Sequence, residues 1–376
     1  MAVQGIVATY DLTVGVKLDI EDLITLISPT DVPLLGGQGA DGGSALASGP
    51  IFEKKYEWLD EDLLLPRSTS GALVSSTTTT TLTVATGHQI RFSTGDSLLL
   101  ASGEQVRVTD YGTTTDTLIV TRAFNSSTAA NITTGDSITI IGNILAEGSD
   151  PSKARSQDRN NRFNYTQIFG PTAVQVSGSE NAVQKYGLSV TEFDKQVANR
   201  TREQFIEIEQ AILYGQRIED TSNRWRAFGG LNYWISTNVD STTTVITETL
   251  LLNQIQSCYD AGGSPDRLVV GSKQKRTISG FAVGITVQTF RPDTERGTVV
   301  DFFDSDFGRV STLLNRWVNK PHAFLFSRDQ AEVVTLRPMQ FEMLSKTGDS
   351  EKGQVVCEKG FKLRAQQHAA VFNALT

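Results

Sequence analysis

The sequence predicts an α+β fold that carries a separate all-β domain as an insertion. Three observations lead to this prediction. A long amphipathic helix is expected over 189–214, short strand patterns dominate after residue 298, and the window 72–142 differs in composition from the rest of the chain. That window has no Pro, Cys, Met, Trp or Lys and only eight charged residues, so we treat it as a domain of its own.

The overall composition excludes several protein classes. The 376 residues include 34 basic and 42 acidic side chains, a net charge of −8, and 39% are hydrophobic, as in ordinary globular proteins. No apolar run approaches the roughly 18 residues that span a membrane, and no signal-peptide pattern is present. The acidic balance argues against binding of nucleic acid by charge. Only Cys258 and Cys357 are present, so we expect no disulfide framework and a reducing compartment.

Residues 1–50 show little periodic pattern. One short helix is expected at Asp19–Ile27, ended by Pro29, and a glycine-rich stretch follows up to Gly49. We interpret 1–50 as an extended arm, which needs a surface to lie against. In the next segment, 51–66, aromatic side chains alternate with charged ones, a pattern that predicts a strand with one buried face.

The window 72–142 is predicted to form a small β-barrel or sandwich. Its β-branched residues alternate regularly, which disfavours the alternative of a disordered linker. Strands are expected at Leu82–Val84, Ser97–Leu100, Gln105–Thr109, Thr117–Thr121 and Ser137–Ile141. A returning strand pattern over 163–178 follows the window, so 51–66 and 163–178 are expected to form the two sides of a long hairpin.

The clearest helix covers Ser189–Tyr214. Apolar residues recur every three or four positions along it, and charged residues occupy the other face. Ser189 and Glu192 form a capping-box pattern at its start, and Gly215 is expected to end it in a left-handed conformation. A helix this long with a single apolar stripe predicts a spine across a flat domain.

Mixed helix and strand patterns fill the rest of the chain. Helices are expected at Glu248–Asp260 and Ser272–Ser279. Strands are expected at Leu268–Val270, Val299–Phe303, Arg309–Leu314, Ala323–Phe326, Glu332–Leu336, Gln354–Glu358 and Phe361–Ala365.

No pattern in the sequence supports catalysis, and we predict that the protein is not an enzyme. The histidines His88, His322 and His368 lie in different segments, without a second ligand at metal-binding spacing. The glycines of 37–42 match the dinucleotide fingerprint, but without the required strand before and helix after, so we interpret them as a hinge. Asp304–Gly308 begins like a calcium loop but lacks the glutamate at position twelve, which favours a turn joining two strands. We expect no catalytic, cofactor-binding or metal-binding residues.

Seven charged residues are the candidates for contacts between subunits. The basic group comprises Lys153, Arg155, Arg159 and Arg162, and the acidic group comprises Asp60, Glu61 and Asp62 on the opposite side of the expected hairpin. On a chain of net charge −8, a local basic cluster is more often a partner for an acidic patch than a phosphate site. We expect the two groups to meet across a subunit boundary.

At these segments the chain resembles the major capsid proteins of tailed bacteriophages, which have the HK97-like fold. The order and spacing of several short stretches, from about residue 160 to the end, carry the resemblance. These stretches are Asn164–Phe169, Val176–Ser179, Asp260–Asp266, Lys275–Phe281, Asp301–Gly308 with Asn315 and Arg316, Leu336–Pro338 and Lys346–Lys352.

The resemblance implies a division into domains. It assigns 1–50 to an N-terminal arm, 51–71 and 143–180 to the strands of an extended hairpin called the E-loop, and 72–142 to an all-β insertion domain in that loop. It assigns 181–224 and 336–376 to a peripheral domain with the spine helix 189–214, and 225–335 to an axial domain.

The resemblance also implies a function. A major capsid protein is expected in the virion, assembled in the host bacterial cytoplasm as pentamers and hexamers of an icosahedral shell around double-stranded DNA that is not tightly bound. Because no charged helical leader precedes the arm, we expect a separate scaffold protein or none; portal and decoration proteins are the other partners considered. The alternatives are an encapsulin-like nanocompartment shell, which packs enzymes, and a phage tail or adhesion protein, which is expected to lack the capped spine helix.

Overall fold

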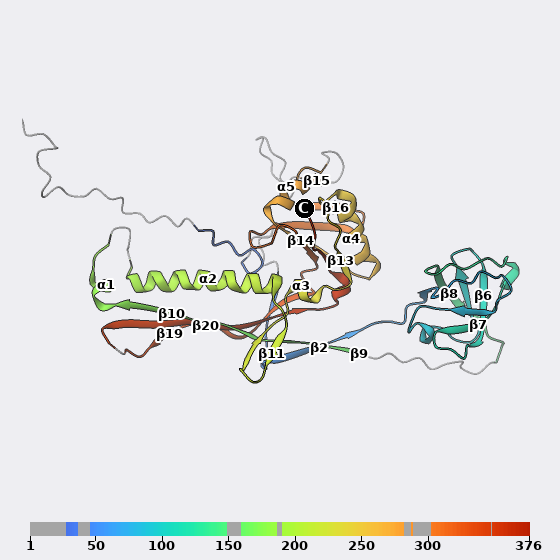
Figure 1. Cartoon of the computed structure of the whole chain (residues 1–376), viewed down its shortest axis with the longest axis horizontal. Helices are drawn as coiled ribbons and strands as arrows, with labels where there is room; N and C mark the ends of the chain where they lie inside the picture. Colours follow the sequence, from blue (N-terminus) through green and yellow to red (C-terminus); the bar gives the residue numbers. More distant parts are fainter. Residues whose placement is uncertain are drawn as a thin grey trace, which may run out of the picture. The chain divides into compact units, whose positions relative to one another are not determined.

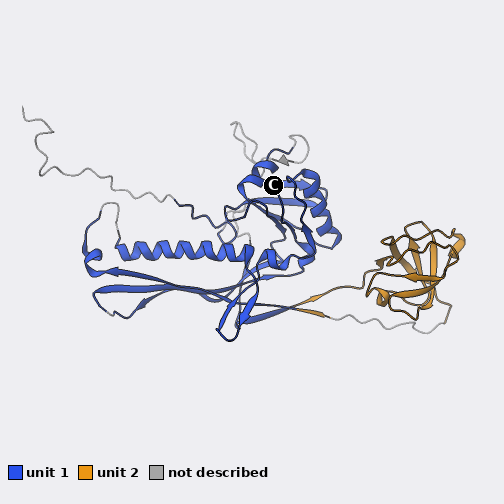
Figure 2. Ribbon diagram, in the orientation of Figure 1, with its two compact units in different colours: residues 1–58, 162–376 blue, residues 59–161 orange. Residues whose placement is uncertain are grey.

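The computed structural model describes residues 28–36, 46–148, 159–185, 190–281, 287–288, 302–346 and 348–376. The chain divides into two compact units (Figure 2). Unit 1 comprises Met1–Trp58 and Arg162–Thr376, and unit 2 comprises Leu59–Asn161. The expected helix at Asp19–Ile27 and the glycine pattern at 37–42 lie outside the described residues.

Unit 2 is built on a six-stranded antiparallel sheet with the order β3-β8-β5-β6-β7-β4. Its strands are β3 (Arg67–Thr69), β4 (Thr81–Thr83), β5 (Asp96–Leu100), β6 (Gln105–Tyr111), β7 (Thr117–Thr121) and β8 (Ser137–Asn143). The five strands expected within 72–142 are present, and β3 adds a sixth from before that window. Alternate side chains fill one apolar core, in which Phe92, Leu98 and Val106 are fully buried. Short 3-10 helices lie at Gln89–Arg91 and Phe124–Ser126.

Strands β2 (Lys55–Glu61) and β9 (Arg159–Tyr165) form a separate two-stranded sheet. The predicted pairing of outgoing and returning segments is therefore present, but it is shorter than 51–66 and 163–178. The returning pattern is divided: β9 pairs with β2, whereas β10 (Gln167–Ser177) pairs with β20. Tyr56 and Trp58 are buried and their neighbours along β2 are exposed, which is the alternation that predicts a strand here.

A four-stranded sheet with the order β1-β19-β20-β10 forms one layer of unit 1. Besides β10, its strands are β1 (Ala47–Pro50), β19 (Ala331–Leu344) and β20 (Ser350–Leu363). The prediction of two separate strands in 354–365 is wrong, because Gly360 stays in the ladder opposite Val334 and β20 runs on unbroken. β1 lies within the region expected to be an extended arm that needs a surface to lie against. Its sequence Ala-Ser-Gly-Pro has no apolar alternation, and parallel backbone pairing with β19 holds it.

Helix α2 (Glu192–Tyr214) lies along this sheet and contacts β10 and β20 (Figure 1). Ser189, the predicted cap, lies outside the described residues, and the cap of α2 in the structure is Thr191. The helix begins later because the Thr191 hydroxyl accepts a hydrogen bond from the Asp194 N–H at 3.2 Å. Ile208 and Ile212, on the face of α2 that enters the main core of unit 1, are fully buried.

The end of α2 also differs from the prediction. Gly215 has φ −52°, which is not the left-handed conformation expected for it. Glycine is required there for space instead. A Cβ at this position would lie 2.5 Å from the carbonyl oxygen of Ala211 and 2.6 Å from that of Phe228.

A seven-stranded mixed sheet with the order β13-β21-β18-β14-β17-β16-β15 forms the second sheet of unit 1. Its strands are β13 (Asn238–Asp240), β14 (Arg267–Val270), β15 (Val287–Gln288), β16 (Phe302–Ser305), β17 (Gly308–Leu314), β18 (Ala323–Phe326) and β21 (Ala370–Phe372). Helices α4 (Glu248–Asp260) and α5 (Ser272–Ile278) occupy the predicted positions. A turn joins β16 to β17, as expected for Asp304–Gly308. Although 336–376 was expected to belong with the long helix, β21 pairs with β13 and β18, from within 225–335.

The remaining elements are short. They are α1 (Gly178–Ala182), α3 (Leu231–Trp234), β11 (Ile218–Asp220), β12 (Trp225–Ala227) and a 3-10 helix at Gln366–His368. β11 and β12 pair with each other. None has more than five residues, too few to show a period in the sequence. In the part of the chain that the structure describes, no helix combines the length and apolarity needed to cross a membrane.

Candidate subunit contacts

The described residues hold no cluster suited to metal binding. Among them, no three His, Cys, Asp or Glu side chains gather closely enough to share an ion. The histidines have structural surroundings: His88 Nδ1 lies 2.9 Å from Ser68 Oγ, and the His322 ring stacks on Phe324. Burial lowers the pKa of His322. Both cysteines are buried free thiols.

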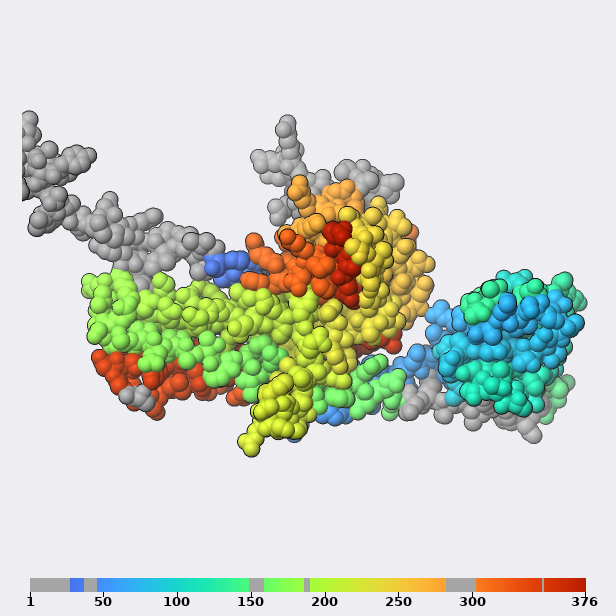
Figure 3. Space-filling model, in the orientation of Figure 1, coloured from blue at the N-terminus to red at the C-terminus, as the bar shows by residue number. Residues whose placement is uncertain are grey.

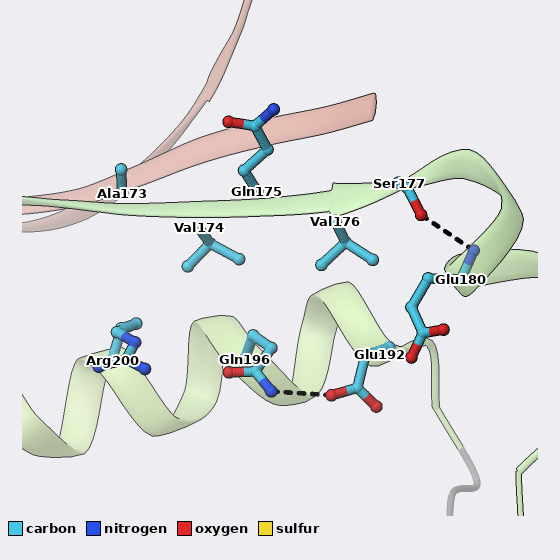
Figure 4. Close-up of a pocket in the computed structure, with 9 residues that line it drawn as sticks. All are labelled: Ala173, Val174, Gln175, Val176, Ser177, Glu180, Glu192, Gln196 and Arg200. Atoms are coloured by element: carbon cyan, nitrogen blue, oxygen red, sulfur yellow. Dashed lines mark hydrogen bonds between the residues drawn. The ribbon is translucent and has the colours of Figure 1, made fainter. Parts of the chain in front are cut away.

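A groove of about 360 Å³ lies between β10 and the first turns of α2 (Figure 4). Val174 and Val176 point into it from the strand, and ion-paired or hydrogen-bonded side chains close its end. Glu192 accepts hydrogen bonds from Gln196 Nε2 at 2.8 Å and Lys185 Nζ at 3.2 Å. These bonds hold the pKa of Glu192 below its ordinary value. The groove therefore lies at the junction of β10 and the start of α2. The negative charge of Glu192 beside it is already balanced by Lys185.

The base of the β2–β9 hairpin is fixed by buried hydrogen bonds. Asn164, fully buried, donates from Nδ2 to the Phe361 carbonyl at 2.6 Å and to the Gly229 carbonyl at 3.1 Å. Its Oδ1 accepts the Gly229 N–H at 3.0 Å. The Tyr56 hydroxyl donates to the same Phe361 carbonyl at 2.6 Å. One amide thus joins β9, β20 and the segment before α3, with its buried polar atoms satisfied.

A charged cluster next to it holds the start of β10. Thr166 is fully buried and its hydroxyl donates to Glu358 Oε1 at 2.5 Å. Arg226 pairs with the same carboxylate oxygen, and Arg337 Nε lies 3.1 Å from the other one. Burial alone raises the pKa of Glu358, but Thr166 and the two arginines outweigh it, so the pKa is lowered. The cluster ties β12 and β19 to β20 beside the hairpin base.

Arg217 adds an aromatic contact at the same base. Its guanidinium lies 4.2 Å from the Phe163 ring centroid and 5.4 Å from that of Tyr233. Its Nη1 donates to the Phe163 carbonyl at 3.0 Å. The hairpin therefore has a base held by three kinds of contact.

The structure places Glu61 and Arg159, from the acidic and the basic group of predicted contact residues, beside each other. Arg159 Nε lies 3.5 Å from Glu61 Oε2 across the hairpin, and both side chains are at least half exposed, so the pair contributes at most about 1 kcal/mol. Asp62 follows β2 and is exposed. The other described candidates are Asp60 on β2 and Arg162 on β9. Lys153 and Arg155 lie outside the described residues.

Exposed apolar side chains near the acidic group escaped the sequence analysis. Phe52 is 89% exposed, Leu63 69% and Leu59 61%. Leu59 and Leu63 were assigned no role from the sequence. Phe52 was predicted on the buried face with Tyr56 and Trp58, and this prediction is wrong, because Phe52 precedes β2 and is exposed. Their exposure becomes apparent only in the structure, where no other described element covers these side chains.

The N-terminal segment is seated on α2 rather than loose at residues 31–36. Leu34 is fully buried in the main core, and its N–H donates to Glu209 Oε1 at 3.2 Å. The Asp31 carboxylate pairs with Arg316 at 2.8 Å, and the Asp31 carbonyl accepts from Trp317 Nε1 at 2.8 Å. Figure 3 shows this segment against α2 and the residues that follow β17. We call this contact the arm seat.

Comparison with solved structures identifies the fold. The capsid of a native GTA particle covers 100% of both chains at 7% identity with a TM-score of 0.55. The capsid of Myoviridae phage XM1 covers 99% of this chain and 100% of its own at 9% identity and TM-score 0.52. A Microbacterium phage Oxtober96 structure covers 96% of each chain at 8% identity and TM-score 0.51. At these identities the likeness establishes the fold alone, which is the HK97-like fold.

The family follows from the sequence itself. No curated protein matches the chain. The family described as SU10 major capsid protein, in contrast, matches residues 6–376, nearly the whole length. The chain therefore belongs to the SU10 major capsid protein family and is a structural protein of tailed-bacteriophage virions, not an enzyme, that assembles into a multi-subunit icosahedral shell.

Proposed function

We propose that this capsid protein assembles as pentamers and hexamers, and that the β2–β9 hairpin is the E-loop that links neighbouring subunits. The observation that carries the proposal is the hairpin itself: a base locked by Asn164 and Tyr56, and beyond it exposed Leu59 and Leu63 beside acidic residues. A rigid base lets a contact at the far end resist displacement of a whole subunit. Symmetry then repeats one such contact around each ring.

Charge pairing supplies the specificity of the proposed contact. We assign Asp60, Glu61 and Asp62 of one subunit to Lys153, Arg155, Arg159 and Arg162 of its neighbour. The internal pair of Glu61 with Arg159 is exposed and weak, so it competes little with pairs between subunits. Covering Leu59 and Leu63 adds about 1.5–3 kcal/mol for each side chain fully buried. Apolar burial thus provides affinity and the charges provide register.

We further assign residues 72–142 to an insertion domain of that E-loop and 225–335, with β21, to the axial domain. The shell encloses double-stranded DNA without holding it tightly, because a chain of net charge −8 has no general attraction for phosphate. Assembly takes place in the host bacterial cytoplasm, with a separate scaffold protein or none, and with portal and decoration proteins as the other candidate partners. Tight, salt-sensitive duplex binding by empty shells would contradict the weak hold on DNA.

The test is a charge exchange read by negative-stain electron microscopy beside a sizing column. Wild-type protein is expected to give closed shells or rings of five and six. Asp62→Lys is expected to reduce them at least tenfold, and adding Lys153→Asp is expected to restore them, because the exchanged pair attracts again. Asp329→Lys, which reverses an exposed acid elsewhere, is the matched control and is expected to assemble as wild type.

Three outcomes would count against the proposal. If Asp62→Lys assembles at the wild-type level, the acidic group takes no part in the contact. If assembly is lost and the second exchange does not restore it, the assigned charge pairing is wrong. If the wild-type protein stays monomeric even with the scaffold candidate of the same genome, the proposal of assembly is wrong. Enzyme cargo in place of DNA inside shells would favour an encapsulin-like compartment.

A further inference from the structure

Glu209 is a buried acid at the one place where the N-terminal segment meets α2 in the described structure. Its side chain is fully buried, on the face of α2 that carries Ile208 and Ile212. An isolated carboxylate in such a place is costly, because burial removes the water that stabilises its charge. The contact proposed for the hairpin assigns this residue no role.

The hydrogen bonds of Glu209 are divided unequally between its two oxygens. Oε1 accepts the Leu34 N–H at 3.2 Å and Asn315 Nδ2 at 2.5 Å. Oε2 is buried and has no hydrogen-bond partner. The absence of a donor at Oε2, together with full burial, disfavours the ionised form of the carboxyl. An ionised group would leave half of its charge on an oxygen without a donor.

The charges around Glu209 do not offset its ionisation. From the arm segment, the acidic Asp31 faces it, and Asp31 is itself paired with Arg316 from the segment after β17. One turn away on α2, Phe205 and Leu213 are apolar. Burial raises the pKa of Glu209 to about 7, although the donors at Leu34, Asn315 and Leu35 oppose the rise.

We propose that Glu209 is a proton-controlled latch for the arm seat: residues 31–36 are held firmly on α2 when its carboxyl is protonated and weakly when it ionises. The geometry gives the reason. Lifting residues 31–36 removes Leu34 from the core and exposes Glu209 to water, where a carboxylate is stable. When residues 31–36 return to α2, the two carboxyl oxygens of Glu209 are buried again, and the carboxyl therefore takes up a proton. The latch is a property of one subunit and does not depend on the hairpin contact proposed above.

The pH range follows from linkage. The seated group has a pKa of about 7 and the solvated group an ordinary pKa of about 4.5, so seating is strongest below the ordinary value. Between these values the seating constant falls about tenfold for each unit of rising pH, and it levels off above pH 7. From pH 5 to pH 7 the expected weakening is about 40-fold.

Hydrogen exchange on the full-length chain tests the latch. The protection of amides in residues 31–36, corrected for the intrinsic exchange rate, is measured from pH 5 to pH 8. Wild type is expected to lose protection along the predicted slope. Glu209→Gln, which keeps an acceptor but cannot ionise, is expected to stay protected at all pH values. Glu207→Gln, exposed on the same helix, is the matched control and is expected to follow wild type.

A second variant keeps the test decisive if Glu209→Gln does not fold. Leu34→Ala removes the buried anchor and leaves the carboxyl in place, so protection is expected to be lower at every pH with the wild-type slope kept. Protection in wild type that does not change with pH would overturn the proposal. So would a full wild-type slope in Glu209→Gln, or a flat profile in Leu34→Ala.

Discussion

Glu104 and Arg122 form a buried ion pair inside unit 2. Arg122 Nε and Nη2 each lie 2.7 Å from a carboxylate oxygen, and the two side chains are 0% and 6% exposed. The N–H groups of Ala123 and Ala130 donate to the same carboxylate at 2.9 and 3.0 Å. Arg122 also donates to two carbonyls of the Thr-rich tract 75–81. A single arginine thus joins Glu104, the Thr-rich tract 75–81 and the connection between β7 and β8.

The pair predicts a large effect of removing one partner. Arg122→Met leaves a buried carboxylate without its counter-charge and is expected to cost unit 2 about 3–5 kcal/mol of unfolding free energy, measured by denaturant titration. Arg309→Met, which breaks the exposed pair with Asp304, is the control and is expected to cost under about 1 kcal/mol. Equal costs for the two variants would show that burial does not set the value of the pair.

The same pair makes unit 2 sensitive to acid. Burial raises the pKa of Glu104, but Arg122 and the two backbone donors outweigh it, and the net pKa lies below the ordinary value. A lowered carboxyl pKa means that the contribution to stability is present above the ordinary value of about 4.5. It is lost as the pH falls from there through the folded-state value, opposite in sign to the behaviour of Glu209.

At the scale of elements, the two ends of α2 are determined differently. Side-chain capping sets the first end, and the close approach of distant backbone segments sets the second. Thr191 and Asp194 supply the cap, and Thr191 Oγ1 also donates to the Asp194 carboxylate at 2.6 Å. At the other end, Gly215 N–H donates to Ala211 at 2.8 Å and its carbonyl accepts from Gly230 at 2.9 Å. The chain turns here between two backbone segments, and no side chain fits.

This turn predicts the effect of a single methyl group. Gly215→Ala places a Cβ against two carbonyl oxygens that belong to backbone and cannot swing away, so it is expected to destabilise unit 1 by about 1–3 kcal/mol. Gly348→Ala is the control, because nothing lies within 4 Å of a Cβ there. Thermal unfolding of the two variants measures the difference. A stability of Gly215→Ala equal to that of Gly348→Ala would contradict the close approach.

At the scale of the whole molecule, the two units have separate cores. The core of unit 2 is contributed by residues 74–138, while the main core of unit 1 joins residues as distant as Leu34 and Val371. Cooperative unfolding requires a shared core, and separate cores unfold as separate domains. This property belongs to the subunit before assembly.

We therefore expect two transitions in calorimetry of the unassembled protein. Arg122→Met is expected to lower only the transition of unit 2, and Gly215→Ala only that of unit 1, because neither substitution touches the other core. A 1 kcal/mol change in the free energy of unfolding shifts the midpoint of a transition by roughly 2–8 °C in domains of these sizes. A shift of this size shows which of the two peaks each variant changes. A single transition shifted by both variants would show that the units are thermodynamically coupled.

The sequence by itself determined what depends on neighbouring residues. The five strands of 72–142, the helix Glu248–Asp260 and the turn at Asp304–Gly308 follow from alternation, helical period and turn chemistry, all of which are local. The absence of a catalytic pattern and the resemblance to capsid proteins could likewise be recognised from the sequence alone. The seven charged candidates were found by composition, and their pairing between subunits stays a prediction.

Only the tertiary structure decided what depends on residues distant in the chain. β1 has no side-chain pattern that predicts a strand, and it is a strand because it pairs with β19, which lies nearly 300 residues away in the chain. β20 continues through Gly360 because β19 pairs with it there. Asn164 and Glu209 look like ordinary polar residues until the backbone of Gly229, Phe361 or Leu34 is brought to them. The physical reason is the same in each case: burial and hydrogen bonding are set by the partner, and the partner is chosen by the fold.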